Sequence, residues 1–261
     1  MNWRPVLAAI DVDGTLLNFD GSLSTAVADA VGRASDAGVH IIIATGRSMH
    51  ATLPVCDRLG IASGFAVSSN GAVVVDVAAR VPVDVATFDA TESVRFFADS
   101  VPDALLAVEQ LGVGYRVTGE FPPGELDGQI TVVTHDELLE APVTRLVARL
   151  PNGNREEFFE LARAAGLRGV DYAIGYTAWL DFMPEGVSKA SGLATVCEKL
   201  SVRQADVLAV GDGHNDLEML AWAGRGVAMG QAPDDVKAIA DEVCRSVDED
   251  GVAVLLDGYL R

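Results

Sequence analysis

The chain has 261 residues, of which 49% are hydrophobic, and it carries a formal net charge of −19. This length fits one or two domains, and the hydrophobic share suffices for a large core without disulfides or a structural metal. The charge excludes a general affinity for nucleic acid or anionic membrane, because both require a cationic surface. Binding of an anionic ligand is compatible with this net charge if a metal ion, a lysine or a helix N-terminus supplies local positive charge.

The cysteines and the N-terminus indicate a cellular compartment. Cys56, Cys197 and Cys244 lie far apart and form no metal-binding spacing, which favours a reducing environment. The first apolar segment, which carries Asp11 and Asp13, is too short and too acidic for a signal peptide, and no run approaches the ~18 apolar residues of a membrane span. We therefore expect a soluble, cytoplasmic protein without a membrane or nucleic-acid partner. No pattern specifies an oligomeric state.

The first third of the chain alternates apolar runs with amphipathic stretches. Runs at residues 6–10, 39–44 and 64–67 predict strands, and the stretches at 22–37 and 48–59 predict helices. The runs are continuous rather than alternating. This favours strands that are covered on both faces, as in a parallel α/β sheet.

The last third repeats this alternation. Apolar residues at i, i+3, i+4 and i+7 over residues 193–200 predict a helix, and the runs at 207–210 and 226–229 predict strands. One further helix is predicted from Leu217. Another is predicted after Pro233, with its apolar face at Val236, Ile239, Ala240 and Val243.

The middle of the chain differs from both ends. A loop-like segment at 119–128 lies among strand candidates at 104–108, 144–150, 170–174 and 179–183 and helix candidates at 91–98 and 155–165. We predict a smaller α+β domain over residues 83–183, inserted into an α/β domain formed by residues 1–82 and 184–261.

Two carboxylates, Asp11 and Asp13, follow closely on the apolar run at residues 6–10. Side chains two residues apart on an extended chain point the same way, and ligands bind at the C-terminal edge of a parallel sheet. Gly14 then allows the backbone to approach an anion closely. The pattern favours a site for a metal ion or a phosphate over a packing role.

Two other interpretations of this segment exist. Asp13-Gly14 is also a turn signal for a β-hairpin, although the preceding run does not alternate and the following residues indicate a loop that leads into a helix. An EF-hand is excluded, because Thr15, Leu16 and Ser22 occupy the positions that require an acidic or amide ligand, a glycine and a glutamate. The hairpin turn remains the alternative.

A second polar cluster, residues 211–216, follows the run at 207–210 and opens a predicted helix. Asp212 and Asp216 offer few, hard oxygen ligands, which fits Mg²⁺ better than Zn²⁺ or Ca²⁺. The glycine pair is similar to a dinucleotide-binding fingerprint, but Asp216 occupies the third glycine position and would repel a pyrophosphate. Capping of the helix by Asn215 or Asp216 explains one residue and not the whole set.

Weaker signals lie between and beside these clusters. Thr45, Gly46 and Arg47 follow the second apolar run, where a hydroxyl, a glycine and a cation suit a phosphate oxygen; Thr45 suits a helix cap equally well. Lys189 precedes a helix, where an ammonium opposes the helix dipole, as expected if it faces an anion. A solvated surface lysine is the alternative. His214 is interpreted as a residue that either supports the site residues from outside or faces the substrate, and not as a general base.

With these four motifs in this order, the chain resembles the haloacid dehalogenase-like hydrolases, in particular the Cof-type phosphatases with a large α+β cap. The resemblance rests on residues 11–16 (Asp-Val-Asp-Gly-Thr-Leu), 45–47 (Thr-Gly-Arg), Lys189 and 211–216 (Gly-Asp-Gly-His-Asn-Asp), with support from 69–72 (Ser-Asn-Gly-Ala) and 248–253 (Asp-Glu-Asp-Gly-Val-Ala). It spans nearly the whole chain, although the middle matches in placement and size more than in residues. It implies an α/β fold: a Rossmann-like parallel-sheet core domain with an inserted α+β cap domain.

The resemblance also implies a role for each matching residue. Asp11 would attack phosphorus to form an aspartyl-phosphate, and Asp13 would protonate the leaving alcohol and then activate water. The catalytic set it implies is Asp11, Asp13, Thr45 and Lys189. The set implied for the substrate phosphate is Gly14, Thr45, Gly46, Arg47, Lys189 and Asn215. The set implied for Mg²⁺ is Asp11, the backbone carbonyl of Asp13, Asp212 and Asp216.

The predicted activity is therefore Mg²⁺-dependent hydrolysis of a small phosphorylated metabolite. The resemblance favours sugar phosphates, with specificity residing in the inserted domain. A phosphomutase that passes the same intermediate to another hydroxyl is one alternative. A non-catalytic sensor of phosphorylated ligands is another, against which the pair Asp11 and Asp13 argues, because sensing needs no proton shuttle.

Overall fold

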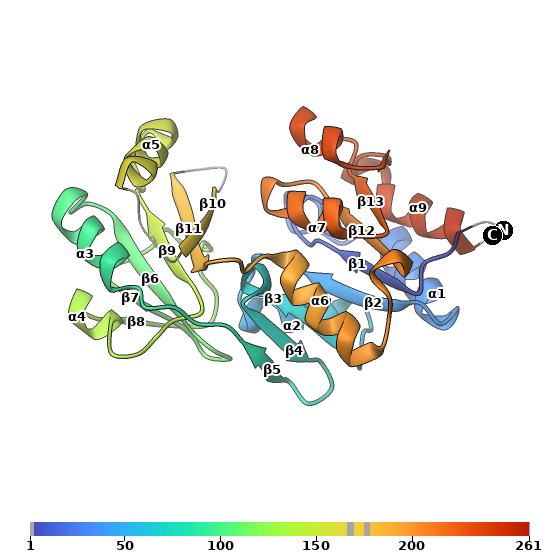
Figure 1. Ribbon diagram of the computed structural model, residues 1–261, viewed down its shortest axis with the longest axis horizontal. Coiled ribbons are helices and arrows are strands. Elements are labelled where there is room, and N and C mark those ends of the chain that lie inside the picture. Colours follow the sequence, from blue (N-terminus) through green and yellow to red (C-terminus); the bar gives the residue numbers. More distant parts are fainter. Residues whose placement is uncertain (1–2, 166–169, 175–177, 261) are drawn as a thin grey trace. The chain divides into compact units, whose positions relative to one another are not determined.

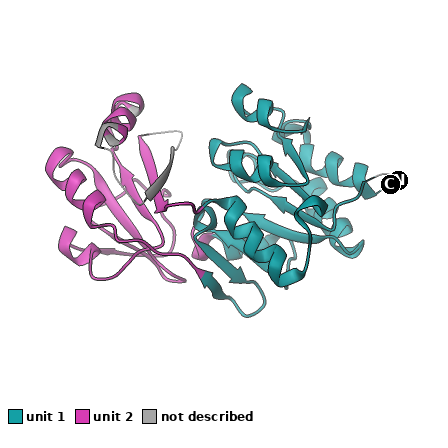
Figure 2. Ribbon diagram, viewed as in Figure 1, with its two compact units in different colours: residues 1–47, 52–84, 188–261 teal, residues 48–51, 85–187 magenta. Residues whose placement is uncertain are grey.

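The structure, a computed structural model, describes residues 3–165, 170–174 and 178–260 and divides into two compact units (Figures 1 and 2). Unit 1 comprises residues 1–47, 52–84 and 188–261, and unit 2 comprises residues 48–51 and 85–187. The predicted fold class, an α/β core with an inserted α+β domain, is confirmed. The unit boundaries fall a few residues beyond the predicted ones, and the grouping of residues 48–51 with unit 2 is new.

Unit 1 contains an eight-stranded sheet in the order β14-β13-β12-β1-β2-β3-β4-β5. Neighbouring strands are parallel from β14 to β3, and β4 is antiparallel to β3. The strands are β1 (Leu7–Ile10), β2 (His40–Ala44), β3 (Phe65–Ser68), β4 (Val73–Asp76), β5 (Val81–Val85), β12 (Val207–Gly211), β13 (Arg225–Ala228) and β14 (Glu242–Val243).

Helices cover both faces of this sheet, which explains why β1 is apolar at every position. On one face, Ala8 and Ile10 pack against α1 (Thr25–Asp36), α2 (Met49–Arg58) and α9 (Gly251–Leu260). On the other face, Leu7 and Ala9 pack against α6 (Lys189–Leu200), α7 (Leu217–Trp222) and α8 (Asp234–Ile239). Four short 3-10 turns are η1 (Ser69–Gly71), η2 (Gln204–Asp206), η3 (His214–Asp216) and η4 (Val247–Glu249).

Unit 2 contains a six-stranded sheet in the order β10-β11-β9-β6-β7-β8. Its strands are β6 (Leu105–Gln110), β7 (Gly114–Val117), β8 (Gln129–Val132), β9 (Leu146–Arg149), β10 (Val170–Ile174) and β11 (Trp179–Pro184). Its helices are α3 (Thr91–Ser100), α4 (His135–Leu138) and α5 (Arg155–Ala165). Residues 119–128 form the predicted loop.

The two faces of the unit 2 sheet differ in chemistry. One face packs on α3, α4 and α5 through an aromatic core, in which the ring of Phe97 lies 5.7 Å from those of both Phe158 and Phe182. Strand alternation directs Tyr115, Arg145 and Asp181 to the other face. There, Arg145 donates to the Asp181 carboxylate (2.6 Å) and to the Tyr115 hydroxyl (2.9 Å). This polar set, Tyr115, Arg145 and Asp181, lies opposite the helices.

Residues 48–51 group with unit 2 through the start of α2. The Glu109 carboxylate accepts a hydrogen bond from the backbone N–H of Met49 (3.1 Å) and a longer one from the Thr144 hydroxyl (3.4 Å). The first N–H groups of a helix have no partner within the helix, so a buried carboxylate there satisfies one of them and favours the helix dipole. The first turn of α2 is thereby tied to β6.

One predicted element is wrong in its extent. The helix after Pro233 ends at Ile239, and Val243, which was expected on its apolar face, lies in β14. The reason is local. Ala240 is extended, and Asp241 exchanges two hydrogen bonds of 2.9 Å with the backbone of Gly226, so the chain turns into pairing with β13.

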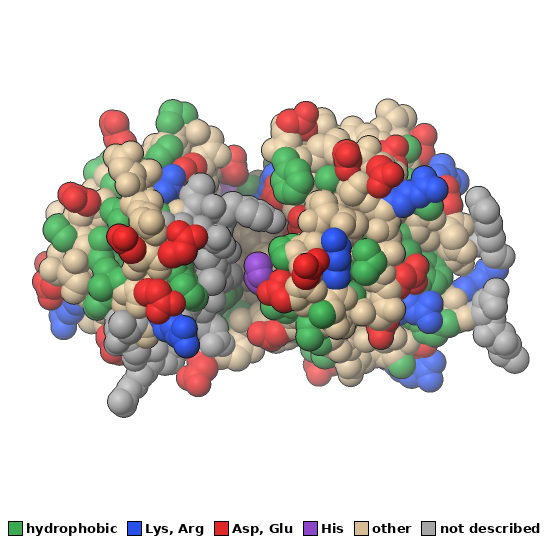
Figure 3. All heavy atoms as spheres, turned by 90° about the horizontal axis from the view of Figure 1, so that it is seen from above, with side chains coloured by type: hydrophobic (Ala, Val, Ile, Leu, Met, Phe, Trp, Pro, Cys, Tyr) green, Lys and Arg blue, Asp and Glu red, His purple; other side chains and the backbone are tan. Residues whose placement is uncertain are grey.

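The surface agrees with the composition. Among the residues that the structure describes, no helix is both long enough and apolar enough to cross a membrane. The net charge of −19 predicts many acidic side chains at the surface. On the face shown in Figure 3, these side chains are spread over both units and do not form one patch.

Candidate active site

The site forms where three neighbouring strands end. Asp11, Asp212 and Thr45 directly follow β1, β12 and β2, respectively. β12 and β2 flank β1 in the sheet, and both pair with it in parallel. Because parallel strands present their C-terminal ends at one edge, residues that are far apart in sequence come together there. All residues of this site belong to unit 1.

Lys189 supplies the positive charge of the site. It is the first residue of α6, it is 0% exposed, and its Nζ donates to Oδ1 of Asp11 and to Oδ1 of Asp216, each at 2.6 Å. Ser188 precedes it, and the Ser188 N–H donates to Ser191 Oγ (3.0 Å), which fixes the start of the helix. Burial would lower the pKa of Lys189, but the two carboxylates outweigh burial and raise its pKa, so the ammonium stays charged.

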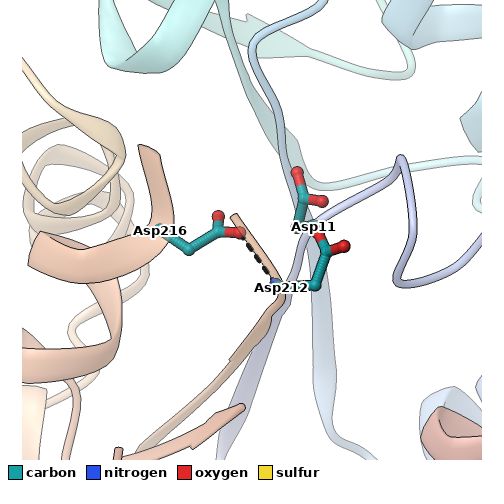
Figure 4. A group of neighbouring side chains, drawn as sticks. All are labelled: Asp11, Asp212 and Asp216. Atoms are coloured by element: carbon teal, nitrogen blue, oxygen red, sulfur yellow. Dashed lines mark hydrogen bonds between the residues drawn. The ribbon is translucent and has the colours of Figure 1, made fainter. Parts of the chain in front are cut away.

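Three buried carboxylates gather here, two of which, Asp11 and Asp216, contact this ammonium. Asp11, Asp212 and Asp216 each offer an oxygen within 4.8 Å of the others (Figure 4). Oδ2 of Asp216 accepts hydrogen bonds from the backbone N–H groups of Asp212 (3.0 Å) and Gly213 (2.9 Å), which fixes its orientation. Burial, followed by the charge of Asp216, raises the pKa of Asp11 well above its usual value and raises the pKa of Asp212 to about 6.

This arrangement fits a divalent cation. One ammonium against three carboxylates leaves excess negative charge in a buried place, which a cation would offset. Hard oxygen ligands suit Mg²⁺. The backbone also lies directly on the carboxylates: a Cβ on Gly14 would be 2.3 Å from Asp212 Oδ2, and one on Gly211 would be 2.4 Å from Asp216 Cγ.

Asp13 is held in another way. Its side chain is 57% exposed and contacts the Arg47 guanidinium through both oxygens, with Nε to Oδ2 at 2.9 Å. The Arg47 N–H in turn donates to Thr45 Oγ1 (3.1 Å), and Thr45 is buried. The Asp13 carboxylate does not belong to the cluster of Asp11, Asp212 and Asp216. Its expected contribution to a metal site is its backbone carbonyl.

Asn70 joins the second and fourth motifs. Its side-chain oxygen accepts a hydrogen bond from Asn215 Nδ2 (3.0 Å), and a Cβ on Gly46 would lie 3.0 Å from that same oxygen. The Asn70 N–H donates to the Thr45 carbonyl (3.0 Å), and its backbone is left-handed (φ 52°). The resemblance included this residue without giving it a role. Asparagine adopts a left-handed backbone more readily than most residues. An asparagine in the loop after β3 is therefore the feature of the sequence that could have drawn attention to this position.

Gln231 is a second residue that the sequence analysis missed. Its Nε2 donates to the Gly14 carbonyl (2.6 Å) and to Asp212 Oδ2 (3.3 Å). It lies just beyond the predicted strand at 226–229, so the rule that identified Asp11 and Asp212, polar residues after a buried strand, would have found it. His214 lies within 2.9 Å of Asp235, and its interpretation as a supporting or substrate-facing residue stays a prediction.

The chain and its fold are similar to those of known proteins. A family model described as haloacid dehalogenase-like hydrolase matches residues 8–107 and 128–256. The chain is 30% identical to a phosphoglycolate phosphatase of Natronomonas pharaonis, with 95% of each chain covered. It is 29% identical to the 5-amino-6-(5-phospho-D-ribitylamino)uracil phosphatase YcsE of Bacillus subtilis, with 95% of this chain and 92% of the relative covered. The solved structure of BT1666 from Bacteroides thetaiotaomicron is similar with a TM-score of 0.80 at 27% identity, covering 97% of this chain and 94% of that one.

Replacement of Lys189 should expose the charge imbalance of the site. Lys189→Met leaves the buried carboxylates of Asp11 and Asp216 without a cation, and removal of one member of a buried ion pair costs about 3–5 kcal/mol of unfolding free energy. Urea unfolding in the presence of a chelator measures this loss. Lys199→Met is the matched control, because Lys199 is an exposed lysine on the same helix. Equal stability of the two variants would contradict the assigned role of Lys189.

Proposed function

The chain belongs to the haloacid dehalogenase-like hydrolases and is a Cof-type phosphatase, and we propose that it uses Asp11 and Mg²⁺ to hydrolyse small phosphorylated metabolites. The observation that carries the proposal is the contact of 2.6 Å between Lys189 Nζ and the Asp11 carboxylate, beside the other two buried carboxylates. It supports a nucleophile that is fixed in orientation and close to a cation site, where the proposed Mg²⁺ would favour the ionised form against the burial that raises the pKa of Asp11.

In the proposed reaction, an oxygen of Asp11 forms a bond to phosphorus while the bond from phosphorus to the leaving oxygen breaks. Asp13 gives the leaving oxygen its proton, and the alcohol departs. Asp13 then takes a proton from water, whose oxygen bonds to phosphorus as the bond between Asp11 and phosphorus breaks. Inorganic phosphate is released, and both carboxylates return to their initial protonation states.

Arg47 is proposed to control when Asp13 takes part. In the structure the guanidinium contacts both oxygens of the Asp13 carboxylate, so neither oxygen is free to carry a proton to a leaving group. The pair must therefore open before the acid step. The exposure of Asp13 leaves space for this movement.

The substrate phosphate is proposed to lie among Thr45, Lys189 and Asn215. Gly14 and Gly46 would let the backbone of their loops approach it, because neither residue has a side chain. Both glycines already lie close to neighbouring polar groups: Gly14 lies close to the Asp212 carboxylate, and Gly46 lies close to the Asn70 amide.

The proposed Mg²⁺ ligands are the carboxylates of Asp11 and Asp212 and the backbone carbonyl of Asp13, with Asp216 in support. When bound, the ion supplies charge that offsets the repulsion between Asp11 and the phosphate, which is about 4 kcal/mol per pair of unit charges at ~4 Å and an effective dielectric constant of ~20. Lys189 adds to this effect from its buried position.

Sugar phosphates are the proposed substrate class, with unit 2 selecting the organic part of the substrate. The relative YcsE carries in its name a phosphorylated ribityl compound, in which a carbon chain bears hydroxyl groups. This name favours a polyhydroxylated substrate.

Substitution of the two carboxylates of the first motif tests the mechanism. Asp11→Asn should abolish phosphate release with little loss of stability, because it removes the nucleophile, and Asp13→Asn should slow release about 10²- to 10⁴-fold, because it removes a general acid and base. Phosphate release from a phosphomonoester is the measurement. Asp57→Asn, which changes an exposed carboxylate paired with Arg80, serves as control. Near-normal turnover by Asp11→Asn would refute the assignment of the nucleophile.

Removal of the metal tests the cofactor. Dialysis against a chelator should abolish turnover, and Mg²⁺ should restore it and raise the melting temperature of the metal-free protein, because an ion that binds the folded state stabilises it by about 2.7 kcal/mol at a hundredfold excess over Kd. Asp212→Asn should lose most of this stabilisation, whereas Asp234→Asn, at an exposed position, should keep it. Full activity in chelator would contradict the proposal.

A substrate panel tests the proposed class. Sugar phosphates, nucleotides and cofactor phosphates are assayed for phosphate release with and without Mg²⁺, with Asp11→Asn as the blank. We expect the highest kcat/KM for a sugar phosphate, because the relative YcsE is named for a substrate with a phosphorylated, hydroxyl-bearing chain. A nucleotide as the best substrate would overturn the class and leave the phosphatase assignment intact.

A further inference from the structure

Gln231 touches the proposed metal site, yet none of the steps above uses it. It is half-buried and lies three residues beyond the end of β13. Its amide is bonded at both ends: Nε2 donates to the Gly14 carbonyl (2.6 Å) and to Asp212 Oδ2 (3.3 Å), while Oε1 accepts from the Val247 N–H (3.0 Å). All hydrogen-bonding atoms of this side chain therefore have partners.

These partners come from three different loops. Gly14 follows β1, Asp212 follows β12, and Val247 lies in η4 after β14. Since the sheet order is β14-β13-β12-β1, Gln231 joins the loops of four consecutive strands at one edge. The lack of a side chain at Gly230 permits this position of Gln231, because a Cβ on residue 230 would lie only 2.7 Å from the backbone nitrogen of Ser246.

The two acceptors of Nε2 are themselves neighbours. A Cβ on Gly14 would be 2.3 Å from Asp212 Oδ2, so the Gly14 backbone and this carboxylate lie against each other. The amide has two N–H hydrogens, one for each acceptor. Its neutrality also matters. A lysine would compete with a metal for Asp212, and a glutamate would repel both Asp212 and the Gly14 carbonyl.

We propose that Gln231 is a positioning residue for Mg²⁺. It orients the Asp212 carboxylate and holds the Gly14 carbonyl, and thereby the adjoining peptide that carries the Asp13 carbonyl, in one arrangement. Outer groups that orient metal ligands in this way commonly change metal affinity by 10- to 100-fold when they are removed. The inference rests on the proposed function, because it takes the Mg²⁺ site as given.

Calorimetric titration of Mg²⁺ into the metal-free protein tests the inference without any assay of activity. Gln231→Met retains the approximate size of the side chain and removes the hydrogen bonds, and it should weaken Mg²⁺ binding by about tenfold or more. Gln204→Met is the matched control: the Gln204 amide donates to the Trp222 carbonyl, outside the set of residues assigned to the site, and its loss should leave Mg²⁺ affinity unchanged. At saturating Mg²⁺, the substrate KM of Gln231→Met should stay within about twofold of wild type, because Gln231 makes no assigned contact with substrate.

A lower melting temperature of Gln231→Met with Mg²⁺ affinity within twofold of wild type would overturn the inference, since it would show a purely structural role. If Gln231→Met does not fold, Gln231→Asn keeps the amide on a side chain one methylene shorter, which should reach only part of the three-loop contact and bind Mg²⁺ more weakly. Wild-type affinity in Gln231→Asn would overturn the inference as well. Absence of Mg²⁺ binding by the wild-type protein is a separate result, because it overturns the proposed function itself.

Discussion

The buried ammonium of Lys189 between Asp11 and Asp216 is the constraint on which the rest of the site depends. Charges that leave water lose several kcal/mol of solvation each unless partners replace it, so the three groups can be buried only together. The partners come from β1, α6 and η3, which are distant in sequence. Correct packing of the two halves of unit 1 is therefore a condition for holding Asp11, the proposed nucleophile, beside the ammonium at the sheet edge. Folding and the proposed chemistry are coupled at this contact.

The sequence was sufficient to predict that the candidate site residues share one edge of the sheet, because their placement follows a simple rule. Asp11 and Asp212 each come after an apolar strand that is covered on both faces, and strands of that kind belong to a parallel sheet whose ends carry ligands. The contacts of Asn70 and Gln231 could not be predicted, because each depends on which loops become neighbours in space. The pairing of Asp13 with Arg47 depends in the same way on the order of β1 and β2.

The elements that the sequence missed share physical causes. β7 and β8 are short, and β8 is exposed along its length, so neither has a clear apolar run. β5 is the edge strand of the unit 1 sheet and β4 is its neighbour, and both follow the tight turn of η1. Helix α9 contains Gly251 and Gly258, which favour loops when read locally, yet it forms because Val252, Leu255 and Leu256 are buried against the sheet and α1. Tertiary burial overrides a weak local signal in α9, whereas β5 and β8 are exposed along their length and pair at the edges of their sheets.

The glycines of the site have a consequence for how this protein can diverge. Gly14, Gly71 and Gly211 each lie so close to neighbouring atoms that a Cβ would collide; on Gly71 it would lie 1.9 Å from the Ser188 carbonyl oxygen. Single substitutions can hardly change the shape of these loops, because the backbone itself lies against the neighbouring atoms of the site. Unit 2 also has closely packed glycines, such as Gly114 and Gly128, but they lie outside the candidate site, and unit 2 contains residues 108–127, the internal segment that the family model leaves unmatched. A lineage of such proteins can thus acquire new preferences in one part of the chain while inheriting an unchanged chemical step in the other.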